Sequence, residues 1–194
     1  MKNIVYYDKN AQNYFDSTKD ADFASTREIL LKYLHPGDHI LDLGCGSGRD
    51  SKAFIDLEYK VTALDGSKKL CELASKLINQ EVICKDYYQI DDVNIYNAIW
   101  ACASLLHLTN DELLEVINIL TRALMEDGYF YLCFKYGTLE REDSNNRHFN
   151  DMTEEKFNEL LQQLEHLKLL EYIVKGNTLQ RENAWLNIVL QKTR

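Results

Sequence analysis

The chain has 194 residues, 45% of them hydrophobic, so it can bury one substantial core, and its length predicts a single domain. Its 31 acidic and 22 basic side chains give a net charge of −9, which repels a phosphate backbone and disfavours general nucleic-acid binding. No stretch approaches the ~20 apolar residues that cross a membrane. The five cysteines are dispersed without a C-x-x-C pair. We therefore expect a cytoplasmic protein with reduced thiols and no metal site.

The predicted elements alternate between helices and strands. Helical spacing over Phe23–Leu34 ends at His35-Pro36-Gly37-Asp38, just before the first strand. Strands are predicted at Ile40–Leu43, Lys60–Leu64, Glu81–Cys84, Ala98–Cys102, Tyr129–Phe134, Lys168–Val174 and Trp185–Gln191, with helices near Ser47–Leu57, Ser67–Ile78, Asp111–Met125 and Glu154–Leu164. The alternation predicts a parallel α/β sheet, and the last two strands look like an antiparallel pair.

The first strand runs directly into three alternating glycines, Gly44, Gly46 and Gly48. Glycine allows both a tight turn and a close backbone approach to a ligand. The helix predicted to begin near Ser47 would direct its free N–H groups and its positive dipole end at that turn. The pattern therefore predicts a binding site for a ligand with an anionic group.

These glycines do not form the dinucleotide-binding pattern G-x-G-x-x-G, because Arg49 stands where the third glycine should be. The pattern from Asp42 to Gly48, D-x-G-x-G-x-G, resembles that of the class I S-adenosylmethionine-dependent methyltransferases, and the resemblance extends over nearly the whole chain. It implies a Rossmann-like sheet of seven mostly parallel strands, with one antiparallel strand near an edge and helices on both faces. It also implies S-adenosylmethionine as cofactor. Arg49-Asp50 and the leading segment YYDKNAQNYF are similar to the tellurite-resistance-type members.

Asp65 ends the second predicted strand, 21 positions after Gly44. An acid about 20 residues beyond a glycine turn is placed to accept hydrogen bonds from two ribose hydroxyls. A helix N-cap is the alternative role, but Ser67 is already suited to cap the next helix. Gly66 would let the backbone pass close to the sugar.

The resemblance implies three further cofactor contacts. Asp86 would accept a hydrogen bond from the adenine amino group, although aspartate is also common in turns. Tyr87 would pack on the adenine ring, or belong simply to the core. Asp42 would lie near the methionine ammonium, or support the glycine loop from behind.

Other contacts are predicted around the methionine portion. Arg49 would bind its carboxylate or an acid of the N-terminal helix, unless it is a solvated cation. Cys45 in the turn and Cys102 in the cavity wall would be small apolar contacts, because methyl transfer needs no enzyme nucleophile. In the resembling branch a tyrosine of the N-terminal segment, residues 1–35, closes over the cofactor, which points to Tyr14 or, secondarily, Tyr7. These rings would otherwise attach a loose terminus to the core.

The methyl acceptor is less defined by the sequence. His107 is the only histidine between the fourth and fifth predicted strands, where it could take a proton from a hydroxyl or amine, or be a packed helix-start residue. The long polar segment 135–153 is a candidate acceptor loop. No N-P-P-[YF] tetrapeptide follows that strand, which argues against methylation of DNA bases. We expect an enzyme that methylates a small molecule; a non-catalytic S-adenosylmethionine-binding regulator, methylation of RNA or protein, and a nucleotide-dependent oxidoreductase are the alternatives.

Overall fold

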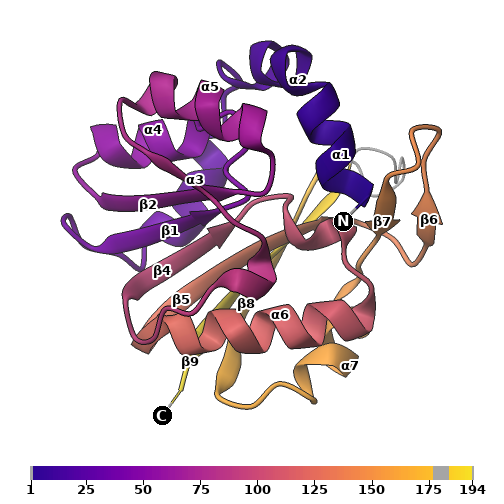
Figure 1. Cartoon of the computed structure of the whole chain (residues 1–194). Coiled ribbons are helices and arrows are strands. Elements are labelled where there is room, and N and C mark those ends of the chain that lie inside the picture. Colours follow the sequence, from indigo (N-terminus) through magenta and orange to yellow (C-terminus); the bar gives the residue numbers. More distant parts are fainter. Residues whose placement is uncertain (1, 177–183, 194) are drawn as a thin grey trace.

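The computed structural model describes residues 2–176 and 184–193, which form a seven-stranded sheet in the order β3-β2-β1-β4-β5-β9-β8 (Figure 1). Only β9 runs against its neighbours, β5 and β8, so the expected antiparallel strand near the edge is confirmed. The strands are β1 (His39–Leu43), β2 (Lys60–Asp65), β3 (Val82–Cys84), β4 (Tyr96–Ala101), β5 (Leu124–Lys135), β8 (Leu167–Lys175) and β9 (Trp185–Lys192).

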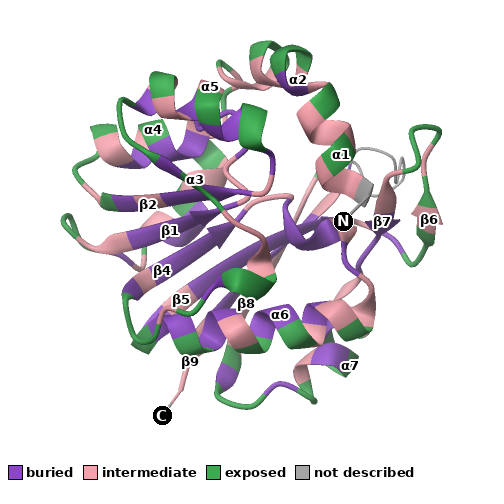
Figure 2. Ribbon diagram, viewed as in Figure 1, coloured by how far each residue is buried: buried purple, intermediate pink, exposed green. Residues whose placement is uncertain are grey.

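Helices cover both faces of the sheet, as predicted. One apolar core lies between the sheet and the helices α3 (Ala24–Leu31), α4 (Arg49–Asp56) and α5 (Lys68–Ile78). The other lies under α6 (Asn110–Ala123) and α7 (Glu154–Leu161). Figure 2 shows the central strands buried between these two layers. The central strands β1 and β4 are buried on both faces, as a doubly covered parallel sheet requires.

The N-terminal segment forms two short helices, α1 (Lys2–Lys9) and α2 (Ala11–Thr18), which contact α5 near the carboxyl ends of the parallel strands (Figure 1). Two 3-10 helices lie at the same end of the sheet: η1 (Tyr87–Gln89) after β3, and η2 (Leu105–His107) after β4. These irregular segments bring side chains to the edge where open α/β sheets bind ligands.

The polar segment 135–153 is more ordered than predicted. It contains a second, two-stranded antiparallel sheet made of β6 (Glu140–Glu142) and β7 (His148–Asn150). Asp143 closes the turn between them, because its side chain accepts backbone N–H groups of Asn145 and Arg147 and pairs with the Arg147 guanidinium. Asx-type bonding of this kind replaces a glycine turn. These two strands were not predicted from the sequence, and the role of the segment as an acceptor loop stays a prediction.

One boundary also differs from its prediction. Helix α6 ends at Ala123, and β5 begins at Leu124, five residues before the predicted Tyr129. Leu124 already pairs with Tyr96, and the exposed residues Met125–Asp127 form an irregularity before regular pairing resumes with Tyr129 opposite Ala98. Among the described residues, no helix has the length and apolar character needed to cross a membrane.

Candidate cofactor and acceptor site

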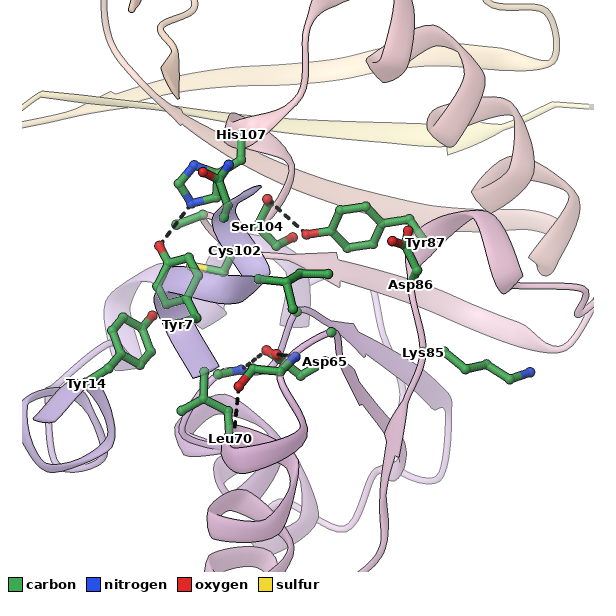
Figure 3. Close-up of a pocket in the computed structure, with 17 residues that line it drawn as sticks. Tyr7, Tyr14, Asp65, Leu70, Lys85, Asp86, Tyr87, Cys102, Ser104 and His107 are labelled. Carbon is green, nitrogen blue, oxygen red and sulfur yellow. Dashed lines mark hydrogen bonds between the residues drawn. The ribbon is translucent and has the colours of Figure 1, made fainter. Parts of the chain in front are cut away.

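A pocket with about 680 Å³ of space, part of it open to solvent, lies at the carboxyl ends of β1, β2 and β4, beneath α1 (Figure 3). It brings together ten of the predicted site residues: Tyr14, Gly44, Gly46, Asp65, Gly66, Ser67, Asp86, Tyr87, Cys102 and His107. They come from segments far apart in the sequence, which the parallel sheet gathers at one edge.

The glycine loop forms one wall of the pocket. Gly44 has φ +69°, and a Cβ atom there would lie only 2.5 Å from Cβ of Ser104. Gly46 has φ +57° and lies against the ring of Tyr14. Both positions therefore need glycine, for the left-handed backbone and for the close approach. The N–H groups of Gly44 and Cys45 donate to the Leu64 carbonyl, which fixes the loop on β2.

Asp65 is the buried carboxylate at the floor of the pocket, with 8% of its surface exposed. Its two oxygens accept backbone N–H groups of Gly46, at 2.9 Å, and Ser67, at 2.8 Å. Burial raises the pKa of Asp65, and these two hydrogen bonds oppose that rise. Each carboxylate oxygen keeps a lone pair for a further donor. Ser67 caps α5 by accepting the Leu70 N–H, as predicted.

Asp86 and Tyr87 lie at the opposite end of the pocket from Tyr14 (Figure 3). Asp86 caps η1 by accepting the Tyr88 N–H at 3.3 Å, so it has a turn role as well as a place in the pocket wall. The Tyr87 hydroxyl donates to the Ser104 carbonyl at 3.2 Å. Burial raises the pKa of Tyr87, which keeps this phenol neutral.

Three predicted site residues, Asp42, Cys45 and Arg49, are not among the side chains that line the pocket. Arg49 pairs with its neighbour Asp50 at 2.6 Å and stacks on Phe23, with its guanidinium carbon 3.6 Å from the ring centroid. It is therefore neither a solvated cation nor bonded to an acid of α1 or α2. Burial and nearby carboxylates raise the pKa of Cys45, in keeping with an apolar role for its thiol.

Asp42 lies behind the glycine loop with 3% of its surface exposed, and it accepts a hydrogen bond from the Ser51 hydroxyl. Burial and the nearby Asp50 raise the pKa of Asp42 to about 7, although Ser51 and Arg49 oppose the rise. A carboxyl whose pKa is higher in the folded than in the unfolded chain stabilises the fold most at low pH. That contribution is lost as the pH rises from about 3.8 to about 7.

Asp42→Asn should therefore gain stability relative to the unmodified protein as the pH rises. Asparagine keeps an acceptor for Ser51 and removes the buried ionisation. We expect the difference in unfolding free energy to shift in favour of the variant by roughly 2–3 kcal/mol between pH 5 and pH 8. Urea unfolding at both pH values measures it, with the exposed Asp56→Asn as control. A difference that does not change with pH would contradict this account of Asp42.

The remaining end of the pocket is formed by Tyr7, Tyr14 and His107. The Tyr7 hydroxyl lies 2.9 Å from Nε2 of His107 (Figure 3), and the ring of Tyr7 meets that of Tyr14 edge to face, with centroids 5.2 Å apart. Nδ1 of His107 lies 2.6 Å from the His148 carbonyl. Burial lowers the pKa of His107 to about 4, so its ring is neutral near pH 7.

Six further residues line the pocket without having been assigned a site role from the sequence: Asn3, Ile4, Leu70, Lys85, Ala103 and Ser104. Asn3 and Ile4 reach the site only because α1 folds back over it. The Ile4 side chain packs closely on Gly66, since a Cβ atom added to Gly66 would lie only 2.7 Å from Cδ1 of Ile4. Ala103 and Ser104 continue the pocket wall from Cys102. The Ser104 hydroxyl is buried without a hydrogen-bond partner, so it is a polar group that a ligand could satisfy.

The comparisons with known proteins agree with this geometry. Residues 40–128 match the family model described as a methyltransferase domain. An uncharacterized protein of Methanocaldococcus jannaschii is 29% identical over 128 residues, or 64% of this chain, and the chain spans about half (48%) of that relative's length.

Two solved structures show the same fold. The 1,6-didemethyltoxoflavin-N1-methyltransferase of Burkholderia thailandensis, solved with 1,6-didemethyltoxoflavin and S-adenosylhomocysteine bound, has a TM-score of 0.82 and 20% identity over 100% of this chain and 88% of its own. The N-methyltransferase NodS of Bradyrhizobium japonicum, also solved with S-adenosylhomocysteine, has a TM-score of 0.70 and 14% identity over 96% of this chain and 98% of its own.

The chain thus has the same Rossmann-like fold as these two solved methyltransferases, and its residues 40–128 are similar to a methyltransferase domain. The pocket lies at the carboxyl ends of the parallel strands, which is the edge where open α/β sheets bind ligands. Within the described residues, no group of three or more His, Cys, Asp or Glu side chains is placed to hold a metal ion.

Proposed function

We propose that this protein transfers the methyl group of S-adenosylmethionine to a small-molecule acceptor. The observation that carries the proposal is the buried Asp65 carboxylate, held by the N–H of Gly46 in the glycine loop and directed into the pocket. A buried carboxylate between a glycine turn and a helix start suits two adjacent ribose hydroxyls. The methyl donor supplies an electrophilic carbon on a sulfonium, and the protein's part is to position and desolvate both partners.

The pocket offers a suitable group for each part of the donor. Asp65 would accept the ribose hydroxyls, and Asp86 would accept the adenine amino group, with Tyr87 beside the ring. The turn at Gly44–Gly46 would face the methionine portion, which Tyr14 covers. Asp42, Cys45 and Arg49 would act from behind by holding the loop in place.

A small acceptor is favoured by charge and by enclosure. The net charge of −9 opposes a nucleic-acid partner, and α1 covers the mouth of the pocket. The solved relative from Burkholderia thailandensis is named for methylation of a small heterocycle, which supports the same class of acceptor here. Within the small-molecule enzymes, Arg49-Asp50 and the N-terminal tyrosines favour the tellurite-resistance-type branch. A cytoplasmic location stays a prediction.

Release of S-adenosylhomocysteine tests the proposal. The protein is incubated with S-adenosylmethionine and with panels of small thiols, amines, phenols and N–H heterocycles, and the product is quantified by mass spectrometry. We expect release that depends on a small acceptor. Release only with RNA or protein would assign the site to a macromolecule instead. Binding of S-adenosylmethionine without release in any panel would favour a non-catalytic regulator.

A further inference from the structure

Three segments meet at the end of the pocket beside Tyr14. Tyr7 comes from α1, His107 from η2 and His148 from β7. Their polar groups form one line: the Tyr7 hydroxyl to Nε2 of His107 at 2.9 Å, and Nδ1 of His107 to the His148 carbonyl at 2.6 Å. The pocket wall includes both Tyr7 and His107.

The direction of each hydrogen bond in this line follows from chemistry. A carbonyl oxygen can only accept a hydrogen bond, so Nδ1 of His107 carries a proton and donates a hydrogen bond to the backbone carbonyl of His148. In a neutral imidazole Nε2 is then an acceptor, so Tyr7 must donate its hydroxyl proton to it. The Tyr7 oxygen has two lone pairs; one faces the Arg147 guanidinium, and the other can accept a hydrogen bond from a ligand in the pocket.

From this geometry we infer that Tyr7 and His107 form a proton relay and that the acceptor is a neutral molecule that loses a proton from N–H or O–H when it is methylated. This inference rests on the proposed function. The acceptor's lone pair forms the bond to the methyl carbon while the carbon–sulfur bond breaks and its electron pair stays on sulfur. The acceptor's proton passes to the Tyr7 oxygen as the Tyr7 proton passes to Nε2 of His107. The resulting imidazolium donates to the His148 carbonyl.

The charges around the relay favour a neutral acceptor. Of the groups facing His107 and Tyr7, Arg147 lies near the rings of Tyr6 and Tyr7 but forms two hydrogen bonds to Asp143, at 2.9 and 2.8 Å. This pairing leaves no unbalanced charge at that wall. Apart from Asp65, the charged side chains that line the pocket are Lys85 and Asp86, at its far end (Figure 3).

The pKa values fit this role. Burial raises the pKa of Tyr7 and outweighs the opposing effect of the Arg147 guanidinium, while Tyr6 and Asp65 add smaller increases, so Tyr7 is a neutral phenol that can both donate and accept. Burial lowers the pKa of His107 and keeps its ring neutral; the charges of Arg147 and of the His148 ring act in the same direction, whereas the hydrogen bond to the His148 backbone and the charge of Asp143 oppose it. A lactam nitrogen or a phenol oxygen becomes a strong acid once the methyl bond forms on it, so a weak base suffices to take its proton.

Tyr7→Phe tests the relay, because phenylalanine keeps the ring and removes the proton-carrying hydroxyl. Tyr6→Phe is the matched control, since it makes the same change one residue earlier on α1, outside the pocket wall. The probes are lumazine and 4-cyanophenol, which carry an N–H and an O–H, and thiophenol, which ionises in water near neutral pH. We expect Tyr7→Phe to lower kcat about 100-fold with lumazine and with 4-cyanophenol. Turnover of thiophenol and the Kd of S-adenosylmethionine should stay within about threefold of the values for the unmodified protein.

A second readout does not depend on turnover. In protein labelled with ¹⁵N-histidine and saturated with S-adenosylhomocysteine, the His107 ring, assigned with His107→Gln, should be protonated at Nδ1 and bare at Nε2 at pH 7. Tyr7→Phe should shift the Nε2 resonance, and Tyr6→Phe should not. The opposite tautomer, an imidazolium at pH 7, or equal kinetics for both variants would overturn the relay.

The remaining outcomes separate this inference from the proposed function. Binding of S-adenosylmethionine without methylation of lumazine or 4-cyanophenol, or methylation of thiophenol alone, would overturn the acceptor class while leaving the cofactor site intact. Failure to bind S-adenosylmethionine at all would overturn the proposed function itself.

Discussion

Asp65→Asn is expected to weaken S-adenosylhomocysteine binding about 100-fold, the largest loss of affinity for a single-atom exchange in this pocket. The two carboxylate oxygens each accept a backbone N–H, from Gly46 and from Ser67. An asparagine has only one such oxygen, so its amide NH₂ would face one of these donors. The ribose hydroxyls would lose their negatively charged hydrogen-bond acceptor. Loss of such an acceptor costs about 1.5–3 kcal/mol of binding free energy, and the upper part of this range corresponds to about 100-fold in Kd.

Calorimetric titration measures this change, with Asp56→Asn as control, because Asp56 is an exposed carboxylate on α4 paired with Lys52. The control should bind S-adenosylhomocysteine as the unmodified protein does. Unfolding curves for both variants establish that the domain is intact. A folded Asp65→Asn protein whose Kd changes less than threefold would show that the ribose does not lie on this carboxylate.

Gly44→Ala should have the largest effect on stability. The new Cβ would lie 2.5 Å from Cβ of Ser104, and the backbone φ of +69° is one that alanine adopts only with strain. Strain of about 1–2 kcal/mol and overpacking of about 1–3 kcal/mol together predict a loss of roughly 2–5 kcal/mol in unfolding free energy. Urea unfolding, followed by tryptophan fluorescence, measures it.

Gly37→Ala separates the two causes, because Gly37 also has a positive φ, +90°, with no atom within 4 Å of the added Cβ. It should lose only the backbone term, about 1–2 kcal/mol. Adding Ser104→Gly to Gly44→Ala removes the clashing atom, so the double variant should be more stable than the sum of the single losses predicts. Equal losses for Gly37→Ala and Gly44→Ala would contradict the close contact between Gly44 and Ser104.

The part of the site that the sequence predicted is the part built by local chain order. A strand, a glycine turn and a helix start lie within eleven residues, and Asp65 ends the neighbouring strand, so a parallel sheet must bring them together. Ser67 is similar, because a helix N-cap is a local pattern. These features depend on residues that are close together in the sequence and on a parallel sheet covered by helices on both faces.

The part that the sequence missed depends on long-range packing. Nothing in the residues of α1 specifies that Ile4 covers Gly66 or that Tyr7 meets His107, a hundred positions away. The pairing of Arg49 with Asp50, rather than with a ligand, reflects two buried neighbours that sequence alone cannot place. The strands β6 and β7 were not predicted because the turn between them contains no glycine; the Asp143 side chain holds it by accepting backbone hydrogen bonds.

Calorimetric titration of the purified protein with S-adenosylmethionine, alongside NADH, tests the central claim most directly. The account predicts stoichiometric binding of S-adenosylmethionine, with no heat from NADH, since Arg49 replaces the third glycine that a dinucleotide turn requires. Binding of NADH in place of S-adenosylmethionine would contradict the account and identify the pocket as a dinucleotide site.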